Sequence, residues 1–214
     1  MLLTERDEDI LVTLTSKGRI IALDLLAETW WSITRSGHLE ARRRARRLVE
    51  CGLLRELTVI ARPLPPLREP VFAWQPRDPR PNLTRAERLL QERLSEPPRP
   101  THVYVATSKA AALTGGKAPG LKHPLQATHD LGLMACFLAY KQRSPELARA
   151  WVSEDCLPKP TKRNVRRPDA VILAPSGEVA LAIEFGGAGG AYGRERLEAT
   201  HEHFERLNLA YLLW

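Results

Sequence analysis

Residues 36–54 of the chain read SGHLEARRRARRLVECGLL, and this stretch decides how the N-terminal half folds. At 100° per residue, its apolar side chains share one face of a helix: Ala41, Ala45, Leu48 and Val49. Arginines occupy the opposite side and its flanks: Arg42, Arg43, Arg44, Arg46 and Arg47. The stretch therefore predicts a helix with one packed side and one basic side, ended by Gly52 and followed by a strand.

A basic helix face of this kind can lie along a phosphate backbone or enter the major groove of DNA. Glu40 and Glu50 are the only acidic residues within the stretch, so local ion pairs cannot neutralise the five arginines. We expect Arg42, Arg43, Arg46 and Arg47 to contact double-stranded DNA. The alternative is an ordinary solvated basic face.

Two further helices are expected before this one, and two strands after it. Thr4 and the acidic residues behind it predict a helix that ends at Lys17–Gly18, and residues 20–31 predict another. Residues 53–61 and 70–74 predict two strands that pair as a hairpin. Three helices and a hairpin are typical of a winged helix-turn-helix domain, here residues 1–80. Arg62 and Arg68 stand near the hairpin tip, where we expect a contact with the DNA phosphate backbone. A winged helix that serves as an adaptor for a protein partner is the alternative.

Prolines concentrate between the two halves of the chain. Ten of the 17 prolines fall between Pro63 and Pro100. Proline fixes φ and removes an amide donor, so this segment is not expected inside a sheet. We interpret residues 81–100 as a linker that contains one short helix, over residues 84–94, and separates two domains.

The remaining residues, 101–214, alternate helices and strands. The pattern predicts a strand at 101–107, an apolar helix at 124–141, a strand at 148–155, a hairpin at 169–174 and 178–185, a helix at 194–207 and a strand at 209–214. The whole chain is therefore expected to be an α/β (α+β) protein with two domains.

Two carboxylates stand at matching ends of the predicted hairpin. Asp169 begins its first strand and Glu184 ends the second, and antiparallel pairing brings such positions side by side. Two close carboxylates can hold a divalent cation for phosphodiester hydrolysis. Pro168–Asp169, the hairpin and Glu184 resemble the signature of the PD-(D/E)XK nuclease superfamily. The resemblance implies an αβββαβ core over residues 101–214 and, in an active member, Mg²⁺ held by Asp169 and Glu184.

The chain departs from that signature two residues after Glu184, where the superfamily has a lysine and this chain has Gly186. Arg194 or Arg196 is a candidate replacement, and Glu154 is a candidate additional acid. Without the lysine we expect a degenerate site with no cofactor. A Mg²⁺-dependent endonuclease is the alternative, and so is a pair of ordinary polar residues at strand ends.

A second basic segment precedes Asp169. Residues 157–168 contain five basic side chains and no acid. We expect four of them to contact the DNA backbone beside the nuclease-like core: Lys162, Arg163, Arg166 and Arg167.

Taken together, short stretches from both halves make the chain similar to the replication-relaxation family of plasmid and mobile-element proteins. The stretches are residues 3–11, 45–54, 129–131, 167–170 and 182–184. The resemblance implies DNA binding in plasmid replication, transfer or their regulation, with a degenerate nuclease-like domain. The glycine-rich residues 186–193 depart from the family pattern.

Composition agrees with an anionic partner, because the formal net charge is +7 and the pI is about 9.7. Cys51, Cys136 and Cys156 are widely spaced, as expected of free thiols in a reducing compartment. The sequence shows no signal peptide and no apolar run of about 18 residues, so we expect a cytoplasmic protein that does not bind a membrane. Whether it forms a homodimer or binds replication or transfer proteins is left open.

Overall fold

The structure is a computed structural model that describes residues 2–158, 166–187 and 193–214. It is a mixed α/β protein with two β-sheets, which confirms the expected fold class. Two compact units are each made of two segments: unit 1 of Met1–Ala61 and Pro98–Leu138, unit 2 of Arg62–Pro97 and Ala139–Trp214. This division differs from the sequential one, at residues 80 and 100, that the sequence suggested. Among the described residues, no helix combines the length and apolar composition required to cross a membrane.

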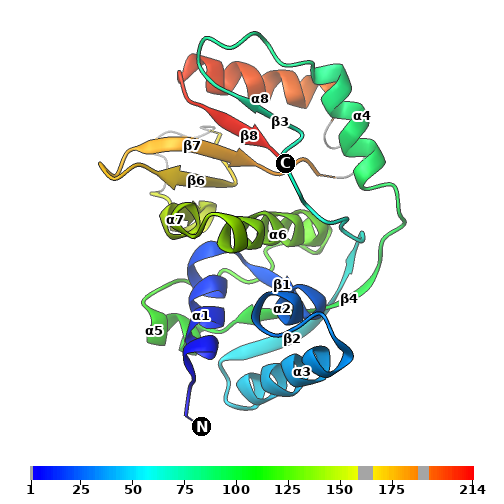
Figure 1. Ribbon diagram of the computed structural model, residues 1–214, viewed down its shortest axis with the longest axis vertical. Coiled ribbons are helices and arrows are strands. Elements are labelled where there is room, and N and C mark those ends of the chain that lie inside the picture. Colours follow the sequence, from blue (N-terminus) through cyan, green and yellow to red (C-terminus); the bar gives the residue numbers. More distant parts are fainter. Residues whose placement is uncertain (1, 159–165, 188–192) are drawn as a thin grey trace. The chain divides into compact units, whose positions relative to one another are not determined.

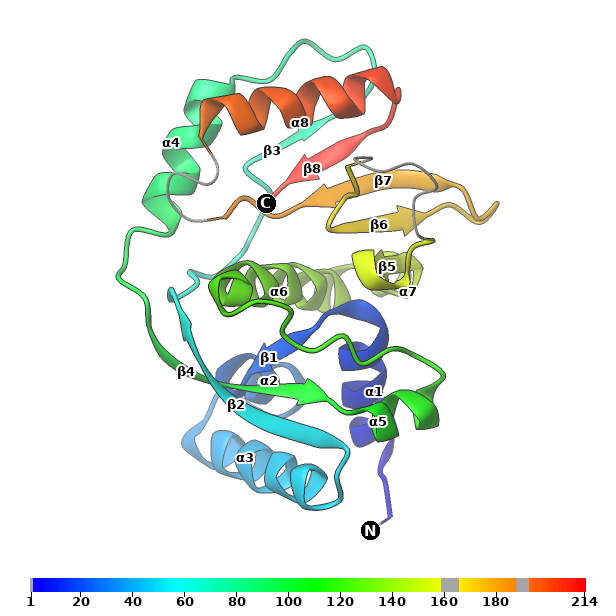
Figure 2. The same cartoon turned by 180° about the vertical axis from the view of Figure 1, so that it is seen from behind.

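Unit 1 begins with α1 (Glu5–Val12), which starts as predicted because Thr4 and Asp7 form a reciprocal capping box. A π-helical turn, Thr13–Lys17, continues the helix to Gly18. The other elements of unit 1 are β1 (Ile20–Ala22), α2 (Leu23–Trp30), α3 (Arg35–Glu50), β2 (Leu54–Ala61), β4 (Arg99–Ala106), α5 (Ser108–Thr114), a 3-10 turn (Pro124–Gln126) and α6 (Ala127–Arg143) as far as Leu138. The strands form an antiparallel sheet in the order β1–β4–β2, and α3 lies alongside β2 (Figure 1 and Figure 2).

The predicted helix over residues 20–31 is wrong in its first turn. Ile20 and Ile21 belong to β1 and pair with Val105 and Tyr104 of β4. Both isoleucines are fully buried, and β-branched side chains pack well on a pleated surface. Pairing with a strand far along the chain therefore outweighs the helical pattern of the residues that follow.

The predicted hairpin between residues 53–61 and 70–74 does not form. β2 pairs along its whole length with β4, from Leu54 opposite Ala106 to Ala61 opposite Arg99. The second predicted strand, β3 (Phe72–Trp74), lies in the other sheet and pairs with β8 (Tyr211–Leu213). The proline-rich residues 62–71 contain no tight turn of the kind that closes a hairpin, so pairing over long range decides the topology.

Unit 2 contains a five-stranded sheet in the order β3–β8–β7–β6–β5. Its further elements are α4 (Leu83–Arg93), α7 (Pro145–Ala150), β5 (Trp151–Ser153), a 3-10 turn (Glu154–Cys156), β6 (Ala170–Leu173), β7 (Val179–Glu184) and α8 (Arg194–Arg206). β5, β6 and β7 are antiparallel, β7 and β8 are parallel, and β8 and β3 are antiparallel. The hairpin predicted at residues 169–174 and 178–185 is confirmed as β6 and β7. The helix predicted after it and the last predicted strand are confirmed as α8 and β8. The strand predicted at 148–155 shortens to β5 because Pro145–Ala150 is helical.

Most of the proline-rich segment, Arg62–Pro97, belongs to unit 2, and Pro98 begins the second segment of unit 1. The short helix predicted in it is confirmed as α4, and Asn82 caps its start by accepting a hydrogen bond from Arg85 N. One buried cluster joins α4 to α8 and β8: Leu83, Ala86, Leu90, Leu197 and Leu213. The apolar side of α4 thus has its partner within the unit.

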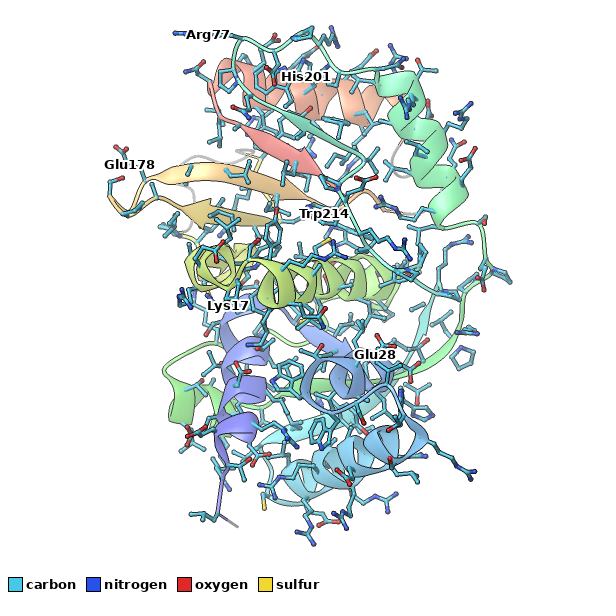
Figure 3. The ribbon with its side chains drawn as sticks, in the orientation of Figure 1. Lys17, Glu28, Arg77, Glu178, His201 and Trp214 are labelled. Carbon is cyan, nitrogen blue, oxygen red and sulfur yellow. The ribbon has the colours of Figure 1, made fainter. Side chains whose placement is uncertain are left out.

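Aromatic side chains complete the core of unit 2. Trp74, Phe204 and Tyr211 are buried together, and His201 Nδ1 lies 3.1 Å from the Tyr211 hydroxyl. Burial lowers the pKa of His201 and raises that of Tyr211. Figure 3 shows His201 on α8 and Trp214 directly after β8. His201 is therefore a neutral core residue of this unit.

Candidate functional site

The basic helix α3 follows α2 after a short turn, residues 31–34. Thr34 caps the helix, since its hydroxyl accepts a hydrogen bond from Gly37 N at 3.1 Å. A Cβ at Gly37 would lie 2.3 Å from the carbonyl oxygen of Ser32, so the turn closes this tightly only around glycine. Turn and cap together fix where α3 begins and which of its sides faces α2.

The two faces of α3 are those expected from the helical pattern. Ala41, Ala45 and Leu48 are at most 1% exposed. The opposite face is exposed and carries four of the five arginines: Arg42, Arg43, Arg46 and Arg47. Nitrogen-tipped side chains project from it in Figure 3. In the part of the chain that the structure describes, none of these four guanidinium groups forms an ion pair with a carboxylate.

Arg44 is the exception among the five arginines. Its Nε donates a hydrogen bond to Asp7 Oδ1 at 2.7 Å, and its Nη2 donates to Asp7 Oδ2. Asp7 is fully buried and also accepts hydrogen bonds from the amide and hydroxyl of Thr4, each at 2.7 Å. Burial alone raises the pKa of Asp7, but the hydrogen bonds from Arg44 and Thr4 outweigh it and hold the pKa below its usual value. Arg44 therefore connects α3 to α1.

A hollow lies between the start of α1 and the exposed face of α3. Its lining includes Arg6, Trp31, Arg43 and Arg47. The guanidinium of Arg6 lies over the Trp31 ring, 4.7 Å from the ring centroid. The sequence alone does not single out Arg6, because it stands in an acidic helix start and its approach to Trp31 is a tertiary contact.

A second candidate site lies in unit 2, at one end of β6 and β7. Ala170 pairs with Ile183, so the structure brings Asp169 and Glu184 to the same end of the two strands. Phe185 N donates a hydrogen bond to Asp169 Oδ2 at 2.8 Å, which holds this carboxylate against the end of β7. Glu184 is only 2% exposed. The two carboxylates are thus neighbours, and one of them is buried.

Two of the residues expected to contact DNA form internal contacts at this site. Arg166 Nη2 lies 3.1 Å from Glu184 Oε2. Arg167 donates hydrogen bonds to the carbonyl oxygens of Glu154 and, at 3.0 Å, of Leu157. The structure therefore gives Arg166 and Arg167 partners inside unit 2. Lys162 and Arg163 lie outside the described residues.

Residue 186, where the nuclease signature has a lysine, is covered by α4. A Cβ at Gly186 would lie 2.4 Å from Leu90 Cδ2 and 2.6 Å from its Cδ1. The suggested replacement Arg194 instead bonds to Glu198 at 2.6 Å and to Thr84, and Arg196 is exposed on α8. Within the described residues, Glu184 pairs with the cation Arg166, which stands shortly before β6. No sequence pattern reveals this contact, because it depends on the tertiary structure.

One oxygen of each carboxylate has a partner at this site: Glu184 Oε2 lies against Arg166, and Asp169 Oδ2 accepts the Phe185 amide. A Mg²⁺ ion would have to share both carboxylates with these partners. The positive charge of Arg166 at Glu184 would also repel the ion. Glu154, the candidate additional acid, contacts this site through its main chain, because its amide donates a hydrogen bond to the Asp169 carbonyl oxygen at 2.9 Å. Across residues 2–158, 166–187 and 193–214, no group of three or more His, Cys, Asp or Glu side chains is arranged to hold a metal ion.

Arg62 does not lie at a hairpin tip. It follows β2 directly, and its Nη1 donates hydrogen bonds to the carbonyl oxygens of Leu94 at 3.2 Å and Glu96 at 2.7 Å. Arg62 therefore holds the chain that leaves α4 against the chain that leaves β2. Arg68 is exposed, and its carbonyl oxygen accepts a hydrogen bond from Arg143.

No protein-family model, no curated protein and no solved structure matches this chain.

Proposed function

We propose that this protein binds double-stranded DNA through α3 and that unit 1 is a winged helix-turn-helix domain. The order of its elements supports this fold, because three helices precede or separate the strands of a small antiparallel sheet. In such domains the third helix enters the major groove. The connection between β2 and β4, where the wing belongs, contains Arg62–Pro97, one of the two segments that make up unit 2.

The observation that carries the proposal is the exposed, unpaired arginine face of α3. The helix has 16 residues and is therefore about 24 Å long, enough to follow a groove over several base pairs. The single arginine of the run that faces protein, Arg44, has a buried carboxylate partner. The other four face solvent, and in the described part of the chain none of them forms an ion pair with a carboxylate.

Positions around the exposed face suggest different roles for the arginines. Arg46 lies at its centre beside Leu39, which is 61% exposed. Arginine reads guanine through O6 and N7, and an apolar side chain contacts the thymine methyl group. Arg42 and Arg47 lie toward the two edges of the face, where the phosphate backbones run.

For unit 2 we infer a nuclease-like fold without cleavage activity. The order α7, β5, β6, β7, α8 and β8 agrees with the αβββαβ core. The ion pair between Arg166 and Glu184, and Leu90 over Gly186, support the absence of cleavage. A role in plasmid replication, transfer or their regulation follows from the resemblance described above.

Charge reversal on α3 tests the DNA-binding proposal. We expect Arg42→Glu combined with Arg46→Glu to weaken binding of a fluorescein-labelled duplex at least about tenfold, since fewer counterions are released. Fluorescence anisotropy in low salt measures the affinity. The matched control is Arg77→Glu combined with Arg88→Glu, two exposed arginines of unit 2 with the same charge change.

Duplex binding that survives the α3 change, with urea unfolding unaltered, would refute the role of this helix. No salt-dependent affinity of the wild-type protein for DNA would favour the adaptor instead. For unit 2, supercoiled plasmid incubated with Mg²⁺ or Mn²⁺ should remain uncut. Nicking that disappears in Asp169→Ala would establish an endonuclease and overturn the second part of the proposal.

A further inference from the structure

The hollow between α1 and α3 carries more positive than negative charge. Asp7 and Arg44 neutralise each other within its lining. The other charged groups there are the guanidinium groups of Arg6, Arg43 and Arg47 and the carboxylate of Glu40. Three cations against one anion create a local potential that attracts an anionic ligand.

Arg43 and Arg47 reach the hollow from α3. They stand four residues apart and are therefore neighbours on one side of the helix. Both side chains are exposed, and within the described residues neither is paired with a carboxylate. Their N–H donors are thus available to phosphate oxygens, which arginine can bind in a bidentate manner.

Arg6 reaches the same hollow from α1. Its guanidinium carbon lies over the Trp31 ring, 4.7 Å from the ring centroid, and within the described residues its N–H donors form no hydrogen bond to the protein. The ring restricts the orientation of Arg6 beforehand, so less side-chain entropy is lost when an anion binds. In the described part of the chain Arg6 forms no ion pair.

We propose that this hollow binds one phosphate of the DNA backbone between Arg6 of α1 and Arg43 and Arg47 of α3. The inference rests on the proposed function, because it requires α3 to meet duplex DNA. In this arrangement α1 takes part in the DNA contact through Arg6, and Trp31 is the positioning residue for Arg6. Because the ligand is a backbone phosphate, the contribution is independent of base sequence.

The test measures how duplex affinity depends on salt in the full-length chain. One lost phosphate contact lowers the slope of log K against log salt by about 0.9. We expect this decrease for Arg6→Gln on two unrelated duplexes, and no decrease for Arg6→Lys, which keeps the charge. Arg88→Gln, an exposed arginine in unit 2, is the matched control and should leave the slope unchanged. Trp31→Leu should weaken binding, whereas Trp31→Phe should retain it.

The outcomes separate this inference from the proposed function. If Arg6→Gln keeps the wild-type slope while the charge reversal at Arg42 and Arg46 weakens binding, the hollow is not a phosphate site but α3 still binds DNA. If neither variant changes binding, both proposals fail. A decrease for Arg6→Gln on only one of the two duplexes would indicate base recognition and overturn the assignment to the backbone.

Free phosphate is the other source of the same chemistry. Calorimetric titration with inorganic phosphate, at an ionic strength matched with chloride, should show no saturable binding to the wild-type protein. Saturable binding that is lost in Arg6→Gln would assign the hollow to a small phosphate ligand and contradict the backbone contact.

Discussion

Replacing Gly186 with alanine probes the contact between α4 and the end of β7. The added methyl group would lie 2.4, 2.6 and 3.1 Å from Leu90 Cδ2, Cδ1 and Cγ, against about 3.5–4.0 Å for relaxed carbon contacts. Leu90 cannot withdraw easily, because it is 1% exposed and packs with Leu197 and Leu213. Overpacking of this kind costs about 1–3 kcal/mol. Reduced freedom of the unfolded chain returns about 0.5 kcal/mol, so we expect a net loss of about 1–2 kcal/mol.

A double-mutant cycle with Leu90→Ala shows whether the collision causes that loss. Leu90→Ala alone should cost about 2–5 kcal/mol, because it leaves a cavity beneath α4. In the double variant the alanine at residue 186 occupies part of that cavity. The combined cost should therefore fall below the sum of the single costs by about 1 kcal/mol.

Urea unfolding followed by tryptophan fluorescence measures each member of the cycle. The matched control pairs Gly186→Ala with Leu89→Ala, a half-buried neighbour on the same helix, and its two costs should add. Additivity within about 0.3 kcal/mol in the Leu90 cycle would refute the placement of Leu90 over Gly186. The explanation for the missing lysine would fail with it.

Three further predictions concern charged and titratable residues. Asp7→Asn should cost about 3 kcal/mol in urea unfolding at pH 7, because Arg44 loses its buried partner. The folded pKa of Asp7 is lowered, so the difference from wild type should persist above about pH 4 and shrink below it; a difference that grows in acid would contradict the ion pair. Arg62→Ala should lower stability by about 2 kcal/mol through two lost hydrogen bonds but leave duplex affinity in anisotropy unchanged, and a weakened affinity would restore Arg62 as a DNA contact. Burial lowers the folded pKa values of His201 and His203, so the urea midpoint should fall as pH drops below about 6.5, where the unfolded chain binds more protons, and a midpoint that rises would be inconsistent with these shifts.

The local pattern of the chain was enough to predict most of its elements. The period of the apolar residues in α3 predicts both its bounds and its two faces, and the capping residue Thr4 predicts the start of α1. The two apolar runs on either side of the turn at residues 175–177 predict the hairpin of β6 and β7, and with it the meeting of Asp169 and Glu184. Each of these depends on side chains only a few residues apart, or on strands joined by one short turn.

Only the tertiary structure decided which strands far apart in the sequence pair with each other. β2 pairs with β4 and not with β3, and Ile20 and Ile21 form a strand because β4 lies beside them. The side-chain pattern of a strand shows that it can pair but not with which other strand, because many strands have a suitable pattern. The partner depends on which strands meet in the folded protein.

Tertiary contacts also distinguish Arg44 from the other arginines of α3. By sequence Arg44 resembles its four neighbours, and only the approach of α1 gives it Asp7 as a partner and leaves the other four exposed. Likewise Leu90 reaches the end of β7 from a segment far away in the sequence. The sequence by itself determined most of the helices, most of the strands and the basic face of α3. The tertiary structure alone decided which charges are paired and which elements share a sheet, because these follow from contacts between segments whose separation along the chain carries no local signal.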